Sequence, residues 1–322
     1  MKQQIRLQDT LKSQDTEEWI DLLFYRPVGY CWALFFKKIN VSPNTVTVFS
    51  ILLGVLAAVF FYYPNSWLNI AGMVLLVWAN MYDSADGQLA RMTGNFSRIG
   101  RLLDGFAGIL WFFSIYLAIT LRLTPEWGFY IWALAAVTGY FHSKQAAMAD
   151  YLRNFHLLFV KDKKISEFDD TAKLGEQARS LTWKNNFFDK LIANYYQSYT
   201  KEQERWTPQL QSFRKTLAAR FGEDFPEKIG SLTLSLNQAQ EADIHDGTPP
   251  KTFREMSKPM MKYANILSFN TRTTALFISL FIGLPWVYFV FELTVMNILL
   301  IYTLRKYEAI CKAFTVRLRG ND

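Results

Sequence analysis

Three aspartates, Asp83, Asp86 and Asp104, lie in or beside the most apolar stretches of this chain. An ionised carboxylate at membrane depth is costly and rare, and such groups usually face a bundle interior or a water-filled cavity where they serve a function. Asp83 and Asp86 are three residues apart, so on a helix their side chains share one face. Asp104 follows a short basic turn and can meet them from the start of the next antiparallel helix. The spacing therefore predicts a cation site between two adjacent helices.

The ligand types indicate which cation such a site prefers. Carboxylates alone suit hard cations such as Mg²⁺, Mn²⁺ or Ca²⁺ and disfavour structural zinc, and Mg²⁺ commonly binds a few carboxylates together with substrate phosphates. Gly87 and Ala90 lie on or beside the acidic face one turn further on, where they leave room for a bulky ligand. Arg91, Arg98 and Arg101 can add contacts to an anion. The simple alternative is that the acids are ordinary helix-end charges paired with these arginines.

The composition indicates a helical membrane protein with one large water-facing insertion. Residues 46–147 and 264–304 are apolar and aromatic, whereas 151–262 is polar with both signs of charge. The net charge of +7 fits Lys and Arg beside anionic lipid, and no basic recognition motif indicates binding of nucleic acid. The two cysteines, Cys31 and Cys311, predict neither a disulfide framework nor a metal pair. The hydrophilic start of the chain predicts no secretory signal peptide.

Six apolar segments are expected to cross the membrane, each with about 20 residues. The first four are expected at residues 46–63, 67–82, 102–123 and 127–147, the third ending before Pro125. The last two share 264–304, in which Arg272 and Glu292 are the only charged residues. Gly283-Leu284-Pro285 is the favoured turn between them. A helix kinked at Pro285, with the turn near Glu292, is the alternative.

The distribution of Lys and Arg predicts the orientation. These residues gather on one side of the expected spans, so both termini, the three aspartates and the insertion are placed in the cytoplasm, at the inner membrane of a bacterium. Residues 17–38 mix aromatic and charged side chains and predict an amphipathic helix along the lipid headgroups. A core helix of a soluble domain is the alternative for this segment.

The expected fold class is all-α: a polytopic membrane protein with six transmembrane helices, an N-terminal amphipathic interfacial helix and a cytoplasmic helical insertion. The expected regions are 1–45 for the cytoplasmic N-terminus with the interfacial helix, 46–150 for transmembrane helices 1–4 with the acidic motif, 151–262 for the insertion, and 263–322 for transmembrane helices 5–6 with the tail.

The fixed residues of the acidic segment follow the pattern Asp83-x2-Asp86-Gly87-x2-Ala90-Arg91-x8-Gly100-x3-Asp104. This pattern resembles the signature of the CDP-alcohol phosphotransferases, also called CDP-alcohol phosphatidyltransferases. Two earlier segments resemble parts of the same family, Tyr25-Arg26-Pro27 and Pro43-Asn44-Thr45-Val46-Thr47. The resemblance covers residues 20–150 well and the last two spans loosely, and the insertion has no counterpart in compact members of the family.

The resemblance implies a six-helix membrane fold, homodimeric, that transfers a substituted phosphate from a CDP-linked donor to an alcohol and releases CMP. CDP-diacylglycerol is the common donor in that family, and a soluble CDP-alcohol attacked by a lipid hydroxyl is the alternative that the resemblance leaves open. The acceptor stays open between inositol phosphate, glycerol phosphate, serine and a sphingolipid alcohol. Asp83, Asp86 and Asp104 would hold Mg²⁺ or Mn²⁺ on the donor pyrophosphate. The positions implied to bind the nucleotide are Gly87, Ala90, Arg91, Gly100, Asn44 and Thr47.

The chain departs from the signature at Gly108, where the family has a fourth aspartate that binds metal and is the proposed base. A general base is worth about 10²–10⁴-fold in rate. One explanation is that another residue takes its place, and His142 and Asp150 are the nearest candidates. A second is that the reaction uses one metal and an acidic acceptor, and a third is that the chain is a degenerate member that binds nucleotide-lipid or a partner without turnover. Lys144 and Arg153 are candidates for contacts to an acceptor phosphate. A third class, an ion-coupled transporter, would also place acids in membrane spans.

Overall fold

The computed structural model of the chain describes residues 15–160, 187–222 and 252–320, together with 7, 13, 175–176, 179–182 and 225. Over these residues the structure contains helices and turns and no strand, which confirms the predicted all-α class. The chain divides into two compact units. The first comprises Met1–Ser143 and Phe269–Met296, and the second comprises Lys144–Ser268 and Asn297–Asp322. The region boundaries expected from the sequence stay a prediction.

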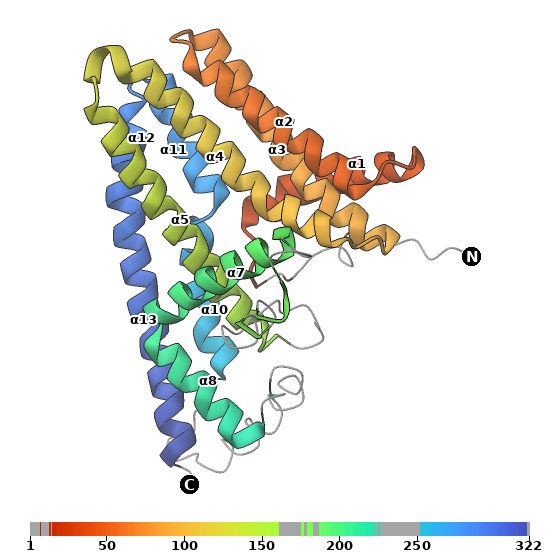
Figure 1. Cartoon of the computed structure of the whole chain (residues 1–322), viewed down its shortest axis with the longest axis vertical. Coiled ribbons are helices and arrows are strands. Elements are labelled where there is room, and N and C mark those ends of the chain that lie inside the picture. The colour runs from red at the N-terminus through yellow and green to blue at the C-terminus, as the bar shows by residue number, and fades with distance from the viewer. Residues whose placement is uncertain are drawn as a thin grey trace. The chain divides into compact units, whose positions relative to one another are not determined.

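The first unit contains the acidic motif. Its elements are the π-helical turn η2 (Asp21–Tyr25), α1 (Arg26–Lys38), α2 (Pro43–Tyr62), α3 (Ser66–Thr93), α4 (Arg98–Trp127), the start of α5 (Tyr130–Leu157), α11 (Phe269–Phe281), α12 (Trp286–Phe291) and the π-helical turn η3 (Glu292–Met296). Helix α3 packs along α2 on one side and against α1 on another, and α4 packs along α2 (Figure 1). The two helices of the motif, α3 and α4, are therefore held by a shared neighbour.

Small residues let α2 approach its neighbours closely. Its buried face carries Ser50, Gly54 and Ala57 at helical spacing. A Cβ atom on Gly54 would lie 2.1 Å from Cδ1 of Trp111 on α4, so this indole fills the space that the glycine leaves. The Trp111 Nε1–H donates to the Ser50 carbonyl at 3.2 Å. Contacts of this kind are typical of helix interfaces in membranes, and here they fix the level of α4 and of its Asp104.

Among the residues that the structure describes, three helical segments are long and apolar enough to cross a membrane, as judged by length and composition: Pro43–Tyr62, Leu103–Trp127 and Trp286–Arg319. The other predicted spans stay predictions, and α11, with 13 residues, is too short for this criterion. Helix α4 continues through Pro125 to Trp127 instead of ending near Leu123, because a proline in the last turn removes only one backbone hydrogen bond. The turn between α11 and α12 lies at Gly283–Pro285, the favoured of the two predicted positions, and Gly283 has a φ of +75°.

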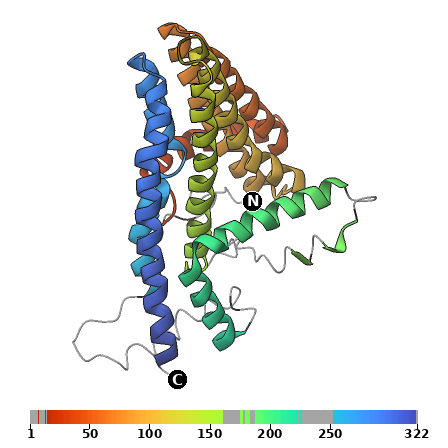
Figure 2. The same ribbon diagram turned by 60° about the vertical axis from the view of Figure 1, so that its left-hand side comes forward.

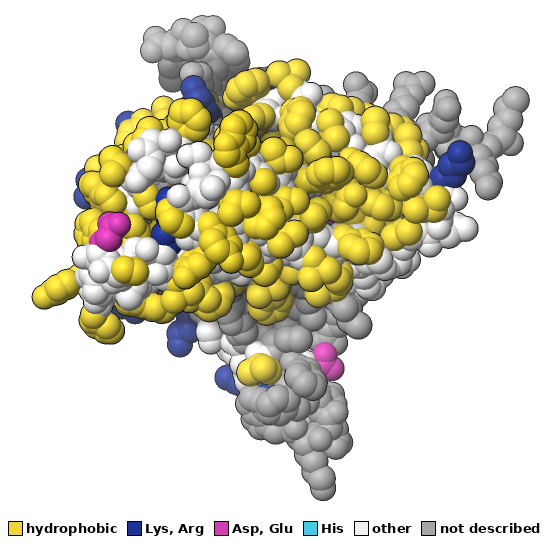
Figure 3. Space-filling model, turned by 90° about the horizontal axis from the view of Figure 1, so that it is seen from above, with side chains coloured by type: hydrophobic (Ala, Val, Ile, Leu, Met, Phe, Trp, Pro, Cys, Tyr) yellow, Lys and Arg dark blue, Asp and Glu magenta, His cyan; other side chains and the backbone are white. Residues whose placement is uncertain are grey.

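The outward surface of the first unit suits a lipid environment. On α2, the side chains of Val48, Leu52, Leu56 and Val59 recur at helical spacing and are 42–59% exposed. Figure 3 shows hydrophobic side chains over most of one face of the molecule, with few charges among them. Soluble monomers rarely expose continuous apolar surface of this size, so this face is expected to contact lipid.

The second unit is a helical cluster around the end of the chain. It contains the last turns of α5 with α7 (Phe187–Trp206), α8 (Pro208–Phe221), α10 (Phe253–Ile266) and α13 (Asn297–Gly320). Helix α8 lies beside α13 (Figure 2), and the Glu308 carboxylate of α13 accepts hydrogen bonds from the N–H groups of Gln209 and Leu210 at 2.7 and 2.9 Å. The described part of the predicted insertion thus belongs to one unit with the C-terminal helix.

Candidate metal centre

One carboxylate oxygen from each of Asp83, Asp86 and Asp104 lies within 4.8 Å of the other two. Asp83 and Asp86 belong to α3, and Asp104 belongs to the second turn of α4. Asp86 is buried with 4% of its surface exposed, Asp83 is half-buried and Asp104 is exposed. The structure therefore brings together the three acids that the sequence singled out, around a site that is closed on the Asp86 side and open on the Asp104 side.

The residues present fit a divalent cation. The Asp86 Oδ2 atom is buried and has no hydrogen-bond partner in the described part of the chain. A desolvated carboxylate oxygen is costly unless a counter-charge satisfies it. Oxygens bound to one Mg²⁺ at about 2.1 Å lie at most about 4.2 Å apart, so the spread of the three aspartates requires only a small side-chain adjustment. The donor set and the unsatisfied oxygen thus suit Mg²⁺ or Mn²⁺, and the ligand roles stay a prediction.

The turn before α4 explains why the motif contains Gly100. Ser97 caps the helix: its Oγ accepts from the Gly100 N–H at 2.8 Å and donates to Oδ1 of Asn44 at 3.0 Å. A Cβ atom on Gly100 would lie 2.5 Å from that Asn44 oxygen. A side chain at position 100 would have to displace the Asn44 amide, the Ser97 hydroxyl or the start of α4. Asn44 and Gly100 therefore lie together at the start of α4, where they set the position of Asp104.

Gly100→Ala is expected to weaken Mn²⁺ binding, because the added methyl group must displace Asn44 or the start of α4. Overpacking of this kind costs about 1–3 kcal/mol, or about 5- to 150-fold in affinity if the whole strain falls on the site. Gly108→Ala is the matched control on the same helix, since its Cβ atom would meet no heavy atom within 4 Å. Titration of Mn²⁺ followed by electron paramagnetic resonance measures the Mn²⁺ affinity of both variants. Equal affinities would contradict the role of Gly100 in setting the position of Asp104.

The other positions implied to bind nucleotide lie along α3 and α2. Gly87 and Ala90 are half-buried, and the Arg91 guanidinium is 3.5 Å from the place of a Cβ atom on Gly87. The Arg91 Nε is buried and has no hydrogen-bond partner among the residues that the structure describes, so it can serve an anion. Thr47 is buried, and its hydroxyl donates to the Pro43 carbonyl at 3.1 Å. The nucleotide roles of all these residues stay predictions. The side chains of Arg98 and Arg101 lie outside the described residues.

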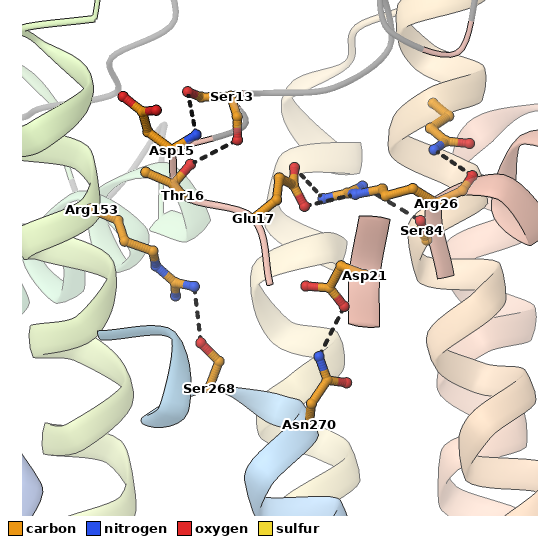
Figure 4. Close-up of polar contacts among 11 residues, drawn as sticks. Ser13, Asp15, Thr16, Glu17, Asp21, Arg26, Ser84, Arg153, Ser268 and Asn270 are labelled. Atoms are coloured by element: carbon orange, nitrogen blue, oxygen red, sulfur yellow. Dashed lines mark hydrogen bonds and ion pairs between the residues drawn. The ribbon is translucent and has the colours of Figure 1, made fainter. Parts of the chain in front are cut away.

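An ion pair beside α3 was not singled out by the sequence. Arg26, at the start of α1, donates from Nε and Nη2 to the two carboxylate oxygens of Glu17, each at 3.0 Å (Figure 4). Its Nη1 points to Oγ of Ser84 at 3.5 Å, directly after Asp83 in the sequence. The only sequence signal for this contact was the Tyr25-Arg26-Pro27 segment. The sequence pattern places Glu17 on an amphipathic surface. A contact between a residue of an irregular segment and a residue of a helix produces no periodic pattern from which it could be predicted.

Helix α11 holds the segment that carries Glu17. The Asn270 amide donates to Oδ1 of Asp21 at 2.9 Å (Figure 4). It also donates to Oε2 of Glu18 at 3.0 Å. Burial raises the pKa of Asp21, and the hydrogen bond from Asn270 partly offsets that rise. The N-terminal segment is thus fixed at two places, by Asn270 at Glu18 and Asp21 and by Arg26 at Glu17.

His142, a predicted substitute base, lies in a buried polar network of the first unit. Its Nδ1 is 2.9 Å from the Tyr116 hydroxyl and 2.7 Å from Nη1 of Arg272, and Arg272 forms an ion pair with Glu292. Tyr116 follows Asp104 by twelve residues on α4, which is about 18 Å of helix rise. Direct proton transfer from an alcohol at the aspartates to His142 would need intervening water. The base role of His142 stays a prediction.

The remaining candidates lie in the second unit. Asp150 is exposed there and is 3.8 Å from Arg153, which also donates to Oγ of Ser268 at 2.9 Å. Lys144 forms an ion pair with Glu202. The base role of Asp150 and the phosphate contacts of Lys144 and Arg153 stay predictions.

The helices that carry the three aspartates are similar in sequence to known proteins. Residues 40–150, which span α2, α3, α4 and most of α5, match the family described as CDP-alcohol phosphatidyltransferase. Over these residues the chain is similar to that family. All three aspartates, Asn44, Thr47 and Gly100 lie inside the matched residues. The resemblance noted from the sequence is therefore confirmed.

Curated relatives of the CDP-alcohol phosphatidyltransferase segment carry names of lipid synthases. The segment is 32% identical over 98 residues to a bifunctional IPC transferase and DIPP synthase of Aquifex aeolicus, covering 30% of this chain and 22% of that protein. It is 37% identical over 90 residues to an archaetidylinositol phosphate synthase of Pyrococcus horikoshii, covering 28% and 46%. It is 35% identical over 80 residues to a phosphatidylinositol phosphate synthase of Mycobacteroides abscessus, covering 22% and 36%. The matches thus span less than half the length of each relative.

Proposed function

We propose that this protein is a metal-dependent CDP-alcohol phosphotransferase of membrane phospholipid synthesis, which transfers a substituted phosphate from a CDP-linked donor to an alcohol. The observation that carries the proposal is the convergence of three carboxylate oxygens within 4.8 Å from two helices of the family segment. In the reaction, the acceptor oxygen bonds to the phosphorus that bears the donor alcohol. The bond from that phosphorus to the oxygen of CMP breaks, and the hydroxyl proton passes to a base or to water.

The residues of the chain bind and orient the reactants in this proposal. Asp83, Asp86 and Asp104 would hold Mg²⁺ or Mn²⁺, which when bound neutralises negative charge at the donor pyrophosphate. Gly87 leaves space beside the carboxylates, and the buried Nε of Arg91 is a donor for a phosphate oxygen. Holding the acceptor hydroxyl in line with the phosphorus supplies much of the remaining acceleration.

An apolar cavity on the same unit supports a lipid-linked donor such as CDP-diacylglycerol. It has a volume of about 410 Å³, and its lining residues come from α1, α3 and α11: Trp32, Met73, Val77, Trp78, Met81 and Phe277. On α3 the lining residues Met73, Val77 and Met81 recur at helical spacing on one face, and Asp83, two residues after Met81, lies about 200° around the same helix. The cavity therefore supplies an apolar surface for acyl chains on the unit that carries the carboxylates, on a different face of α3.

The names of the relatives favour one class of acceptor alcohol. Two of them are named as synthases of an inositol phosphate lipid. We therefore propose an alcohol that itself carries a phosphate as the acceptor. We also propose that the site faces the cytoplasm at the inner membrane and that the protein works as a homodimer, as the family resemblance implies.

Release of CMP tests the proposed activity. Purified protein in nanodiscs with Mg²⁺ or Mn²⁺ and labelled CDP-diacylglycerol should release CMP with at least one phosphorylated alcohol, and chelation should stop the release. Lipid extracts with and without the gene should differ in the product. The proposal fails if no donor and acceptor pair releases CMP and the lipids do not change.

Restoring the fourth aspartate should strengthen the site. Gly108 lies one turn after Asp104 on α4, and a Cβ atom there meets no heavy atom within 4 Å. We expect Gly108→Asp to bind Mn²⁺ about tenfold more tightly and to gain up to about 10²-fold in rate where a base is limiting. Gly108→Asn is the matched control, since it adds the bulk without the charge. Equal Mn²⁺ affinity in the aspartate and asparagine variants would contradict a ligand role at this position.

A degenerate binding protein is the second candidate, because Gly108 offers no side-chain ligand or base at the position of the fourth aspartate. Such a protein would bind nucleotide-lipid at the same carboxylates and turn nothing over. Robust CMP release by the natural sequence would exclude it.

A further inference from the structure

The hydrogen bonds of the Arg26 guanidinium have the geometry of an oxyanion-binding site. Two of its nitrogens donate in parallel to the two oxygens of Glu17, and the carbonyl of Arg26 accepts from Nε2 of Gln88 at 3.1 Å. The Glu17 side chain is 5% exposed and the Arg26 side chain 20%. A guanidinium fork binds carboxylate and phosphate with the same bidentate geometry. The Glu17 carboxylate therefore occupies a position that a phosphate would fit.

The position of Arg26 relates it to the proposed site. Its guanidinium reaches Ser84, and its carbonyl is fixed by Gln88, so it lies along the face of α3 that continues to Arg91 one turn later. Arg91 brings a buried Nε that has no hydrogen-bond partner among the described residues. Two guanidinium groups therefore lie along one face of α3, and the buried Nε donor of Arg91 still needs an acceptor. A phosphate oxygen would supply it.

We propose that Arg26, with Arg91 beside it, binds a phosphate group of a substrate, and that Glu17 occupies Arg26 until that phosphate displaces it. This inference rests on the proposed function for the identity of the substrates. The phosphate can belong to the acceptor alcohol or to the donor pyrophosphate, and the two share the same chemistry at Arg26. Displacement needs only the side chain of Glu17 to move, because Asn270 keeps hold of Asp21 (Figure 4) and of Glu18.

Binding of inorganic phosphate to the full chain tests the site without turnover. In phosphatidylcholine nanodiscs, Glu17→Gln should bind phosphate about five- to tenfold more tightly than the natural protein, because a neutral amide competes less well for the guanidinium. Arg26→Gln should lose that binding, and Arg26→Lys, which keeps the charge without the fork, should weaken it. Glu18→Gln is the matched control: it removes the neighbouring carboxylate that accepts from Asn270, and it should leave phosphate affinity unchanged.

Steady-state kinetics then identify the source of the phosphate. Glu17→Gln should lower KM for one substrate about five- to tenfold with kcat little changed, and Arg26→Lys should raise the same KM. A shift in the acceptor KM assigns the site to the acceptor, and a shift in the donor KM assigns it to the pyrophosphate. If phosphate binding changes while neither KM moves, a lipid headgroup is the ligand and the assignment to a substrate is overturned.

The failures of the two proposals are distinguishable. Tighter phosphate binding in Glu17→Gln without any CMP release would support the Arg26 site and remove the proposed enzyme. CMP release with the same phosphate affinity in the natural protein, Glu17→Gln and Arg26→Lys would keep the enzyme and overturn the site.

Discussion

Asp86→Asn should lower the rate of CMP release about 10³-fold or more. Asp86 is the buried member of the three aspartates, and its Oδ2 has no hydrogen-bond partner in the described part of the chain. Asparagine keeps the volume but removes the charge and one oxygen ligand. A metal ion contributes several kcal/mol of transition-state stabilisation, and each 1.36 kcal/mol is tenfold in rate. The measurement is CMP release at saturating Mg²⁺, together with Mn²⁺ affinity of the same variant.

Glu126→Gln controls for the loss of an acid in the same unit. Glu126 is exposed near the other end of α4, more than twenty residues after Asp104. Its substitution should leave both the rate and Mn²⁺ affinity unchanged. A rate for Asp86→Asn within threefold of the natural protein would show that the buried carboxylate has no part in the reaction.

Arg272→Met should destabilise the first unit by about 3–5 kcal/mol, the usual cost of removing one partner of a buried ion pair. Arg272 is 1% exposed and Glu292 is fully buried, and the two form an ion pair between α11 and η3. The substitution leaves the buried Glu292 carboxylate beside His142 without its cationic partner. Reversible unfolding in mixed detergent micelles measures the free energy.

The double variant Arg272→Met with Glu292→Leu should recover most of that loss, because replacing a whole buried pair by apolar groups is often close to neutral. The recovery is the interaction energy of a double-mutant cycle. Arg122→Met is the control, since Arg122 donates to two uncharged acceptors, the Phe61 carbonyl at 3.1 Å and Oδ1 of Asn69 at 3.4 Å. It should cost about 1 kcal/mol. Additive losses in the double variant would contradict the pairing.

The sequence predicted the acidic site well because its signal is local. Asp83 and Asp86 share a helix face by spacing alone, and the basic turn before Asp104 predicts an antiparallel return. The structure brings these carboxylates together from α3 and α4. The role of Gly100 could not be derived in the same way, because it depends on Asn44, which lies on another helix.

The Arg272–Glu292 pair could be predicted only in part from the sequence. The sequence marked both as the only charges in 264–304, but their pairing depends on where the chain turns. With the turn at Gly283–Pro285, Arg272 lies eleven residues before it and Glu292 seven residues after it, so antiparallel helices bring them to similar depth. The alternative turn near Glu292 would have separated them.

The contacts of the N-terminal segment were beyond the reach of sequence patterns. Glu17 and Arg26 are nine residues apart, and an irregular segment and a π-helical turn lie between them. The 3.6-residue periodicity of an α-helix therefore does not predict their contact. Asn270 joins that segment from more than two hundred residues away. Such contacts follow from tertiary packing, so they require the structure.

Mn²⁺ titration of the full chain in nanodiscs, followed by electron paramagnetic resonance, tests the metal centre most directly. The natural protein should take up Mn²⁺ that Mg²⁺ displaces, and a variant with asparagine at positions 83, 86 and 104 should take up none at the same concentration. Equal uptake by the natural protein and the triple variant would contradict the assignment of these carboxylates to a divalent cation.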